Sequence, residues 1–203
     1  MSKFETALET VKANIVPAIG RGDLVLLGGL AKLGKSPFAA ALAAELEKRR
    51  IAAVVVSLDR WIVSSSGRTK PGVENRFDLQ NALLTLSPWL EQGLALAVTT
   101  PDYDRITRKQ RMNAASLTLA ADAVLILEGV PALLLAIKTP RKVHRIYATG
   151  DETVRRGRVI DDLLARGIES RQIAEEIYRE RQNDEAPRIR EAVAKADYTV
   201  ELA

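Results

Sequence analysis

Residues 29 to 36 read Gly-Leu-Ala-Lys-Leu-Gly-Lys-Ser, which is a complete G-x-x-x-x-G-K-S pattern. Its two glycines allow the backbone to curl until several N–H groups point inward, and this creates a binding site for an anion. In loops of this type the lysine reaches the β and γ phosphates of a nucleotide, and the hydroxyl that follows it holds Mg²⁺. The pattern therefore predicts that ATP and Mg²⁺ are bound by Gly29, Leu30, Ala31, Lys32, Leu33, Gly34, Lys35, Ser36 and Pro37.

The residues around this loop favour the same interpretation. An apolar run at 23–28 precedes it and predicts a buried strand, and an alanine-rich stretch at 36–49 follows it and predicts a helix. Lys32 stands where many such loops carry a further glycine, and a lysine is penalised in the left-handed conformation. Either the peptide at Lys32 is oriented differently from that of the usual glycine, or the loop is degenerate. For the Lys32 side chain, a solvated charge is favoured over a contact with phosphate. For Lys35 we expect a surface-loop charge whose only strong partner is phosphate.

The composition limits the chemistry that the chain can carry out. Its 203 residues, 47% of them hydrophobic, suffice for one well-filled core, so we expect a single domain over residues 1–203. The absence of cysteine excludes a disulfide framework, a thiolate metal site and a cysteine nucleophile. With His144 as the only histidine, a catalytic proton has to move through a carboxylate, a lysine, a tyrosine or water.

The charge pattern bears on the partners of the protein. A formal net charge of +4 suits either polyanions or phosphorylated small molecules. Only 4% of the residues are aromatic, with no stretch that interleaves aromatic and basic residues, so a nucleic-acid partner is not expected. The amino-terminal segment has no apolar core of a signal peptide, and the longest apolar run, 124–137, is too short to span a bilayer. We therefore expect a cytoplasmic protein without a membrane partner.

Short apolar segments alternate with helical ones along the chain, which predicts a three-layer α/β fold with a central parallel sheet flanked by helices. Polar residues follow several of the strands, at the edge where such sheets bind ligands. The predicted strands are 23–28, 51–57, 94–99, 122–127 and 143–148, and the predicted helices are 3–18, 36–49, 78–92, 105–120, 151–165 and 170–195.

Six short segments occur in an order that is found in one family of nucleotide-binding proteins. They are Ser57-Leu58-Asp59, Arg76-Phe77-Asp78, Pro101-Asp102-Tyr103-Asp104, Leu127-Glu128-Gly129-Val130, the arginine-rich helix that Asp151 opens, and Ala196-Asp197-Tyr198-Thr199-Val200. Together with the phosphate loop they resemble the uridine kinase and phosphoribulokinase family of P-loop kinases over nearly the whole chain. The resemblance implies an ATP-dependent phosphotransferase that acts on a hydroxyl of a small acceptor.

The resemblance also implies roles for single residues. Asp59 matches the carboxylate that accepts the proton of the attacking hydroxyl, although an aspartate at a strand end can also be a cap. Glu128 matches the acidic residue that stands near Mg²⁺ with Ser36. The arginines 155, 156, 158 and 166 match a lid at 155–170 that closes over the triphosphate, and Arg158 and Arg166 are the stronger candidates for catalysis. Arg158 and Asp162 could instead form an ordinary helix pair.

The acceptor site is where the chain departs from the family pattern. Uridine kinases carry a histidine five residues after the tyrosine of their Tyr-Asp motif, and this position is Arg108 here. An arginine fork suits carboxylate or phosphate, so an anionic sugar or a hydroxy acid is favoured over uridine. Trp61 is either an apolar wall of the site or a core residue. The predicted acceptor-binding residues are Asp59, Trp61, Arg68, Phe77, Asp78, Tyr103, Arg105 and Arg108.

Two other functions fit parts of the sequence. A RecA-like or regulatory ATPase without a small-molecule acceptor would use the same phosphate loop, and it would usually form a homo-oligomer. A nucleotide-binding module without catalysis would be consistent with the departures at Lys32 and Arg108. ADP release that depends on an acceptor distinguishes the kinase from both alternatives.

Overall fold

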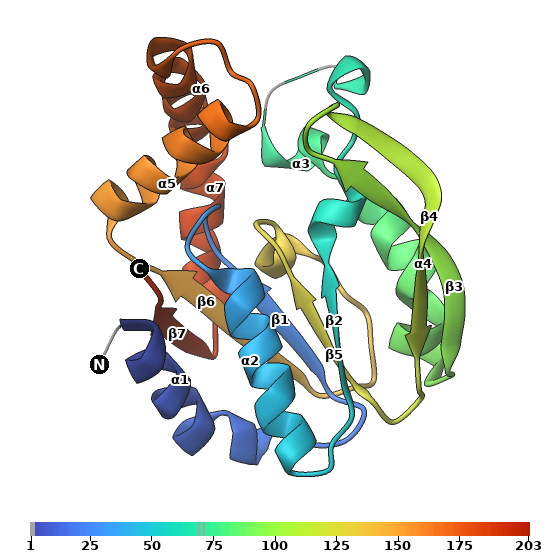
Figure 1. The fold of residues 1–203 in the computed structure, drawn as a ribbon. Helices are drawn as coiled ribbons and strands as arrows, with labels where there is room; N and C mark the ends of the chain where they lie inside the picture. The colour runs from blue at the N-terminus through green and yellow to red at the C-terminus, as the bar shows by residue number, and fades with distance from the viewer. Residues whose placement is uncertain (1–2, 69, 71) are drawn as a thin grey trace.

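The computed structural model describes residues 3–68, 70 and 72–203. A five-stranded parallel sheet lies at its centre, with the strands in the order β2-β5-β1-β6-β7. These strands are β1 (Leu24–Gly28), β2 (Ala53–Ser57), β5 (Val124–Glu128), β6 (Val143–Thr149) and β7 (Tyr198–Glu201). Helices flank the sheet (Figure 1), which confirms the predicted three-layer α/β fold.

On one face of the sheet, α1 (Lys3–Asn14) packs against α2 (Lys35–Lys48), and α2 lies along β1, β2 and β5. On the other face lie two short 3-10 turns, η4 (Ala132–Leu134) and η5 (Ala192–Lys195), together with α7 (Ala186–Glu191). The remaining helices are α3 (Val73–Arg76), α4 (Leu79–Gln92), α5 (Glu152–Ala165) and α6 (Arg171–Asp184).

The register of the sheet brings three chain segments together. Leu27 pairs with Glu128 on β5, Ser57 at the end of β2 pairs with the same Glu128, and Gly28 pairs with Tyr147 on β6. The carboxyl ends of these parallel strands therefore meet at one edge, where ligands of such sheets bind. Every residue of β1 and β5 is buried, as their continuous apolar sequence predicts.

The region after α4 differs from the prediction. The strand expected at 94–99 does not join the parallel sheet, and the helix expected at 105–120 is wrong. Instead β3 (Leu96–Asp104) and β4 (Lys109–Leu119) form a separate antiparallel hairpin. Its turn is closed by the carboxylate of Asp104, which accepts hydrogen bonds from the backbone N–H groups of Ile106 at 2.9 Å and Thr107 at 3.0 Å. This local turn and the cross-strand pairing outweigh the helix propensity of alanine and leucine.

Smaller differences concern the ends of the chain. The helix expected at 170–195 is divided into α6, α7 and η5, with Pro187 in the first turn of α7, where a proline is tolerated. The helix expected at 3–18 ends at Asn14 and is followed by a 3-10 turn at Val16–Ala18. The strand β7 was expected only as a landmark segment and not as a strand.

The α5–α6 region has a hydrophobic core of its own. The main core extends through the sheet and the helices that cover it. A second, smaller cluster holds α5 against α6, and its buried members are Val159, Ile160, Leu163, Ala174 and Tyr178. A separate core is typical of a segment that can move as a unit.

The segment before α4 is mostly irregular, and the helices of the fold are short. The polar segment 64–75 contains a 3-10 turn at Ser65–Gly67 and the short helix α3, while Thr69 and Pro71 lie outside the described residues. Within the described part of the chain, none of the helices combines the length and the apolar character needed to cross a membrane.

Arg141 fixes the end of the fold opposite the phosphate loop. Its guanidinium donates hydrogen bonds to the backbone carbonyls of Trp89 at 2.7 Å, Gly22 at 2.7 Å and Ala121 at 3.1 Å. It also stacks over the Trp89 ring at 3.7 Å from the centroid. One side chain therefore connects α4 with the loops before β1 and β5.

Replacing Arg141 with methionine should lower the free energy of unfolding by about 2 to 4 kcal/mol, because three charged hydrogen bonds and a cation–π contact are lost. Urea denaturation measures the change. Arg49→Met, at an exposed arginine, is the matched control and should change stability by less than about 0.5 kcal/mol. An equal effect of the two substitutions would contradict the role given to Arg141.

Candidate active site

The phosphate loop between β1 and α2 has the backbone that its sequence predicts. Gly29 has φ 135° and approaches β6 so closely that a Cβ atom would lie 2.3 Å from the carbonyl oxygen of Ala148. Gly34, with φ 96°, is the N-cap of α2. Lys32 keeps the left-handed conformation of the usual glycine, with φ 66°, so the loop is not reoriented there. The backbone N–H groups of 34–36 have no acceptor among the described residues, as expected of a helix start that binds an anion.

Lys35 is buried, contrary to its expected place on a surface loop. Its Nζ donates a hydrogen bond of 2.7 Å to the carbonyl oxygen of Leu30, within the same loop. Burial lowers the pKa of Lys35 to about 8, although the carboxylates of Glu128 and Asp59 act in the opposite direction. The ammonium group is thus held under the loop with little water around it, where an anion would interact with it strongly.

Ser36 and Glu128 lie together at the end of β5. The hydroxyl of Ser36 donates a hydrogen bond of 3.0 Å to Glu128 Oε1, and Glu128 is only 4% exposed. Among the described residues no group of three or more His, Cys, Asp or Glu side chains could hold a metal ion. A hydroxyl and one carboxylate nevertheless fit Mg²⁺, because this ion usually takes its other ligands from phosphate and water.

Asp59 faces the same cavity from the end of β2. It lies in the 3-10 turn η2 (Leu58–Trp61), and the cap of this turn is the hydroxyl of Ser57, which accepts a hydrogen bond from the N–H of Asp59. The Asp59 carboxylate is therefore not used as a cap. It forms an ion pair with Arg105, which lies in the turn of the hairpin.

Five of the predicted acceptor-binding residues line the cavity, namely Asp59, Arg68, Tyr103, Arg105 and Arg108. Arg68 donates hydrogen bonds to the Val63 carbonyl oxygen at 2.9 and 3.0 Å and to Tyr103 Oη at 3.2 Å. Its position is thus fixed by neutral groups, and its charge is not balanced by a carboxylate in these contacts.

Three predicted acceptor-binding residues lie elsewhere, and the prediction is corrected for them. Trp61 and Phe77 are buried in the main core, so neither forms a wall of the cavity. Asp78 is the N-cap of α4, where its carboxylate accepts the N–H of Asn81 at 3.0 Å. The sequence could not separate these roles, because an apolar wall and a core position require the same residue types.

The predicted lid, residues 155–170, contacts the phosphate loop directly. Asp162 on α5 forms ion pairs with Lys32 and with Arg166, so the helix pair of Arg158 with Asp162 is not the one that forms. Burial alone would raise the pKa of Asp162, but hydrogen bonds and charges from Lys32 and Arg166 outweigh this effect and lower it. Arg158 lies 3.4 Å from the carbonyl oxygen of Lys32 and lines the cavity, as does Arg166.

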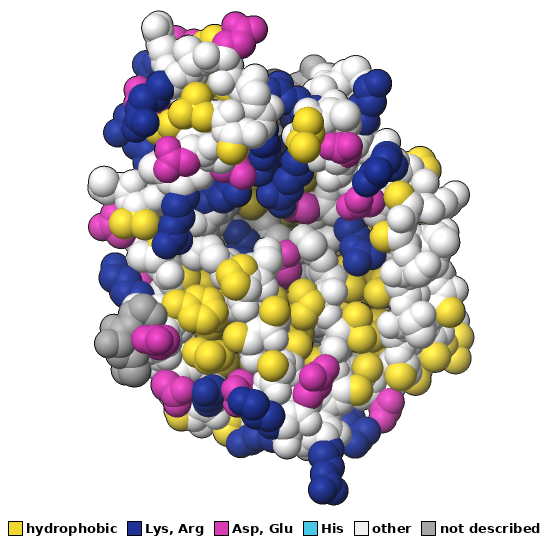
Figure 2. Space-filling model, viewed as in Figure 1, with side chains coloured by type: hydrophobic (Ala, Val, Ile, Leu, Met, Phe, Trp, Pro, Cys, Tyr) yellow, Lys and Arg dark blue, Asp and Glu magenta, His cyan; other side chains and the backbone are white. Residues whose placement is uncertain are grey.

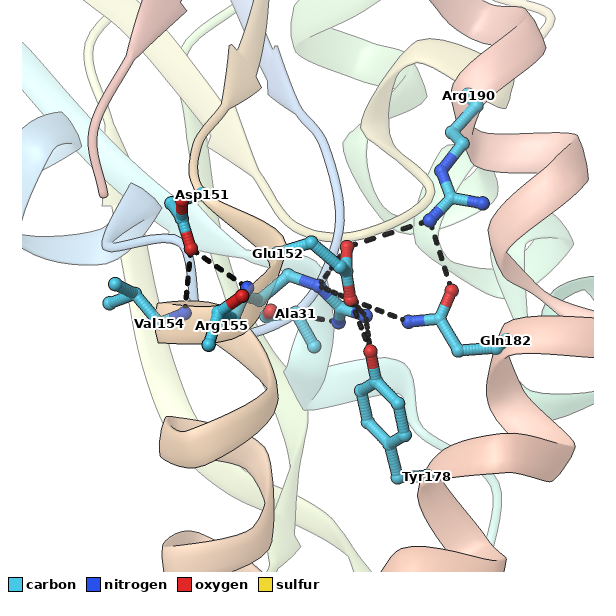
Figure 3. A network of polar contacts seen from close by, with 9 residues as sticks. Ala31, Asp151, Glu152, Val154, Arg155, Tyr178, Gln182 and Arg190 are labelled. Carbon is cyan, nitrogen blue, oxygen red and sulfur yellow. Dashed lines mark hydrogen bonds and ion pairs between the residues drawn. The ribbon is translucent and has the colours of Figure 1, made fainter.

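Arg155 and Arg156 are placed differently from these two arginines. Arg155 is buried, with Nη2 2.6 Å from Glu152 Oε1 (Figure 3), and its Nη1 reaches the carbonyl oxygen of Ala31 at 3.5 Å. Arg156 is exposed and pairs with Glu175 at 3.2 Å. Neither lines the main cavity.

Glu152 is the centre of a polar network that joins three helices (Figure 3). Besides Arg155, its carboxylate accepts hydrogen bonds from Tyr178, from Gln182 at 2.9 Å and from Arg190 at 3.5 Å. The amino terminus of α5 is thereby fixed to α6 and α7. Because Arg155 also reaches the phosphate loop, this network sets the position of the lid relative to that loop.

The phosphate loop, Asp59, the hairpin and the lid enclose one cavity of about 620 Å³. This volume lies within the range usual for small-molecule sites. The described residues that line it include ten Lys or Arg and six Asp or Glu, so positive charge predominates. Figure 2 shows Lys and Arg side chains gathered around a hollow between the lid helices and the hairpin. The lining residues that sequence analysis missed include Arg76, Ile177, Arg181 and Glu185.

No protein-family model and no curated protein matches the sequence. The chain is similar in structure to a candidate fructose transport system kinase from Silicibacter sp. TM1040, with 21% identity, a TM-score of 0.66 and 98% of each chain covered. It is also similar to a candidate uridine kinase from Bacillus stearothermophilus, with 19% identity, a TM-score of 0.63, and 98% of this chain and 100% of that chain covered.

A D-glycerate 3-kinase from Cryptococcus neoformans var. grubii has the same fold, with 12% identity, a TM-score of 0.55, and 87% of this chain and 84% of that chain covered. The fold common to these proteins is that of small-molecule kinases. The chain therefore has the P-loop kinase fold that its resemblance to the uridine kinase and phosphoribulokinase family predicted.

Lys35→Met should stabilise the free protein at pH 7 by about 1 to 3 kcal/mol while abolishing nucleotide binding. The pKa of Lys35 is lower in the folded chain than in the unfolded one, so the unfolded chain binds more protons between about pH 8 and 10.5. Wild-type stability therefore rises through this window, and the advantage of methionine should disappear there. Urea unfolding at several pH values tests this, with Lys48→Met as the exposed control. A loss of stability at pH 7 would contradict the prediction.

Asp162→Asn should loosen the lid, because it removes the carboxylate that holds Lys32 and Arg166. In the free protein, hydrogen exchange over 155–166 should accelerate by roughly tenfold, with a smaller change once a nucleotide analogue is bound. The neighbouring Asp161→Asn, at an exposed position, is the matched control. Equal exchange in the two variants would show that the ion pairs do not hold the lid.

Proposed function

We propose that this protein is a kinase that transfers the γ-phosphoryl group of ATP to a hydroxyl of a small, negatively charged acceptor. The observation that carries the proposal is that a single cavity joins the phosphate loop to Asp59. A nucleotide and an acceptor could therefore meet there without a movement of the core. An ATPase that only hydrolyses ATP would not need the second half of this cavity, which Arg68 and Tyr103 line.

The nucleotide half of the cavity supports ATP with Mg²⁺. The free N–H groups at 34–36 and the buried ammonium of Lys35 would hold the phosphates, and Ser36 with Glu128 would hold the metal ion. When bound, Mg²⁺ neutralises charge on the phosphate oxygens. Burial makes the contact of Lys35 with phosphate stronger than it would be in water.

Asp59 would act on the acceptor. Its carboxylate would orient the acceptor hydroxyl and accept its proton, while the hydroxyl oxygen forms a bond to the γ-phosphorus and the bond from this phosphorus to ADP breaks. Arg105 holds the carboxylate in the meantime through the ion pair, and the hairpin that carries Arg105 borders the cavity. Arg158 and Arg166 would stabilise the negative charge that spreads over the transferred group.

The charge of the acceptor half supports an anionic acceptor. Arg68 and Arg108 line this half, and neither has a carboxylate partner among the described ion pairs. A neutral nucleoside would leave both charges without a partner, and this is unfavourable for Arg68, which is partly buried. The screen for an acceptor should therefore include hydroxy acids and sugar phosphates beside fructose, uridine and D-glycerate, which the names of the similar proteins suggest.

Asp59→Asn tests this function, because it removes the proton acceptor while keeping the size of the side chain. With the best acceptor from a screen for ADP release, kcat should fall by about 10²- to 10⁴-fold, and affinity for an ATP analogue should remain nearly unchanged. Asp122→Asn, at an exposed aspartate that pairs with Arg21, is the control. A folded Asp59→Asn enzyme that keeps more than about a tenth of the wild-type kcat would rule out this role.

A further inference from the structure

Arg181 is a cation of the cavity for which the proposed reaction gives no role. It lies on α6 and lines both the main cavity and a small neighbouring one. Its guanidinium has no hydrogen-bond or ion-pair partner among the residues that the structure describes. An arginine side chain offers five N–H donors, so a large capacity for binding remains unused at this position.

The charges around Arg181 are mainly positive. Its charged neighbours include Arg76, Arg166 and Arg68, whose positive charges lower the pKa of Arg181. The negative charge of Glu185 has the opposite effect on this pKa. Glu185 is already used, because both of its oxygens lie 2.9 Å from Arg76 Nη1. Arg166 is in turn paired with Asp162. Arg181 and Arg68 therefore remain as the two guanidinium groups of this cluster that have no carboxylate partner within the described contacts.

Two other carboxylates of α6, Glu180 and Asp184, also line the cavity. Both side chains are exposed, and neither forms an ion pair with Arg181 in the described part of the chain. Burial and the charge of Arg76 lower the pKa of Arg181 to about 10. The folded protein therefore keeps the Arg181 guanidinium in a place where a positive charge is unfavourable. Such a placement lowers the stability of the protein without ligand, and it is typical of a binding site.

Arg181 and Arg68 approach the cavity from different parts of the fold. Arg181 comes from the lid helices, and Arg68 comes from the segment before α3, which faces these helices in Figure 1. Arg68 uses its Nε and Nη2 for Val63 and Tyr103, while its Nη1 forms no hydrogen bond or ion pair with the described part of the chain. The guanidinium of Arg181 and the Nη1 group of Arg68 carry two unbalanced charges and match a doubly charged oxyanion with several acceptor oxygens, as in a phosphate monoester.

We propose that Arg181 and Arg68 form an oxyanion subsite in the same cavity as the phosphate loop, and that this subsite binds a doubly charged group on the acceptor. Arg181 is then a residue that determines acceptor specificity, and Arg76 with Glu185 fixes the wall beside it. The inference rests on the proposed kinase function for the identity of its ligand. The presence of the subsite can be tested without turnover.

The test is a calorimetric titration with inorganic phosphate while the nucleotide site is filled with a non-hydrolysable ATP analogue and Mg²⁺. The wild type should bind one further phosphate, and Arg181→Gln and Arg68→Gln should each weaken this binding by at least about tenfold, since each removes a charged hydrogen-bond donor. Arg179→Gln, two residues away on the exposed side of α6, is the matched control and should bind as the wild type does. Sodium acetate as a second titrant should bind more weakly, because it carries a single charge.

The unfolding midpoint provides a second measurement. Arg181→Gln should unfold at the same urea concentration as the wild type or at a higher one, because an unbalanced charge is removed. A clear loss of stability would mean that Arg181 is a structural residue. Absence of a second phosphate in the wild type, or equal binding in Arg181→Gln, would overturn the subsite.

The two proposals can fail independently in these assays. Phosphate binding that depends on Arg181, together with no acceptor-dependent ADP release, would reject the kinase function and retain the subsite. If the nucleotide analogue does not bind, the same titration in the Lys35→Met background shows whether a phosphate site that depends on Arg181 exists. Equal binding by Lys35→Met and by Lys35→Met with Arg181→Gln would then overturn the subsite.

Discussion

The constraint on which the structure depends is an excess of positive charge inside a half-enclosed cavity. Ten basic residues of the described chain line it, and one of them, Lys35, is buried enough for its pKa to fall to about 8. Such an arrangement lowers the stability of the free protein, because buried charges are costly without partners. The rest of the fold has to keep the cations in place without neutralising all of them.

Three carboxylates moderate this charge, and each joins two different walls of the cavity. Asp162 connects the lid to Lys32 on the phosphate loop, Asp59 connects the core to Arg105 on the hairpin, and Glu185 connects α6 to Arg76 on α3. Each ion pair thus takes the place that a negatively charged ligand could occupy beside the same cation. In the absence of ligand these pairs hold the walls together, and a phosphate that arrives competes with a carboxylate rather than with water alone.

The parallel sheet and the phosphate loop could be predicted from the sequence, because continuous apolar runs and a fixed spacing of glycine and lysine report local structure directly. The hairpin could not be predicted, since the stretch that forms β4 is rich in alanine and leucine, and its strand form depends on pairing with β3. Asp59 and Glu128 were found because they follow buried strands. The sequence left Trp61 open between a wall of the site and the core, because the direction of its side chain depends on the turn that carries it.

Arg181 illustrates the limit of sequence reasoning in this chain. The segment 170–195 carries many charged residues on all its sides, so its pattern did not indicate which arginine faces the cavity. The orientation is set by the small core between α5 and α6 and by the break before Pro187, which are tertiary features. The burial of Lys35 is likewise a consequence of the curl of the loop, which brings the Leu30 carbonyl to its ammonium group.

The same small core suggests how the two halves of the cavity are coupled. It fixes α5 to α6, and the Glu152 network extends this connection to α7, so Arg158, Arg166 and Arg181 belong to one unit. If the proposed function and subsite hold, a nucleotide that attracts Arg158 and Arg166 would also position Arg181, and an anion held between Arg181 and Arg68 would also position the predicted lid. Two ligands that favour the same placement of one unit bind with positive cooperativity, and this coupling is reciprocal. An acceptor without a negative charge would contact only part of this unit, so it would contribute less to closing the site over the nucleotide.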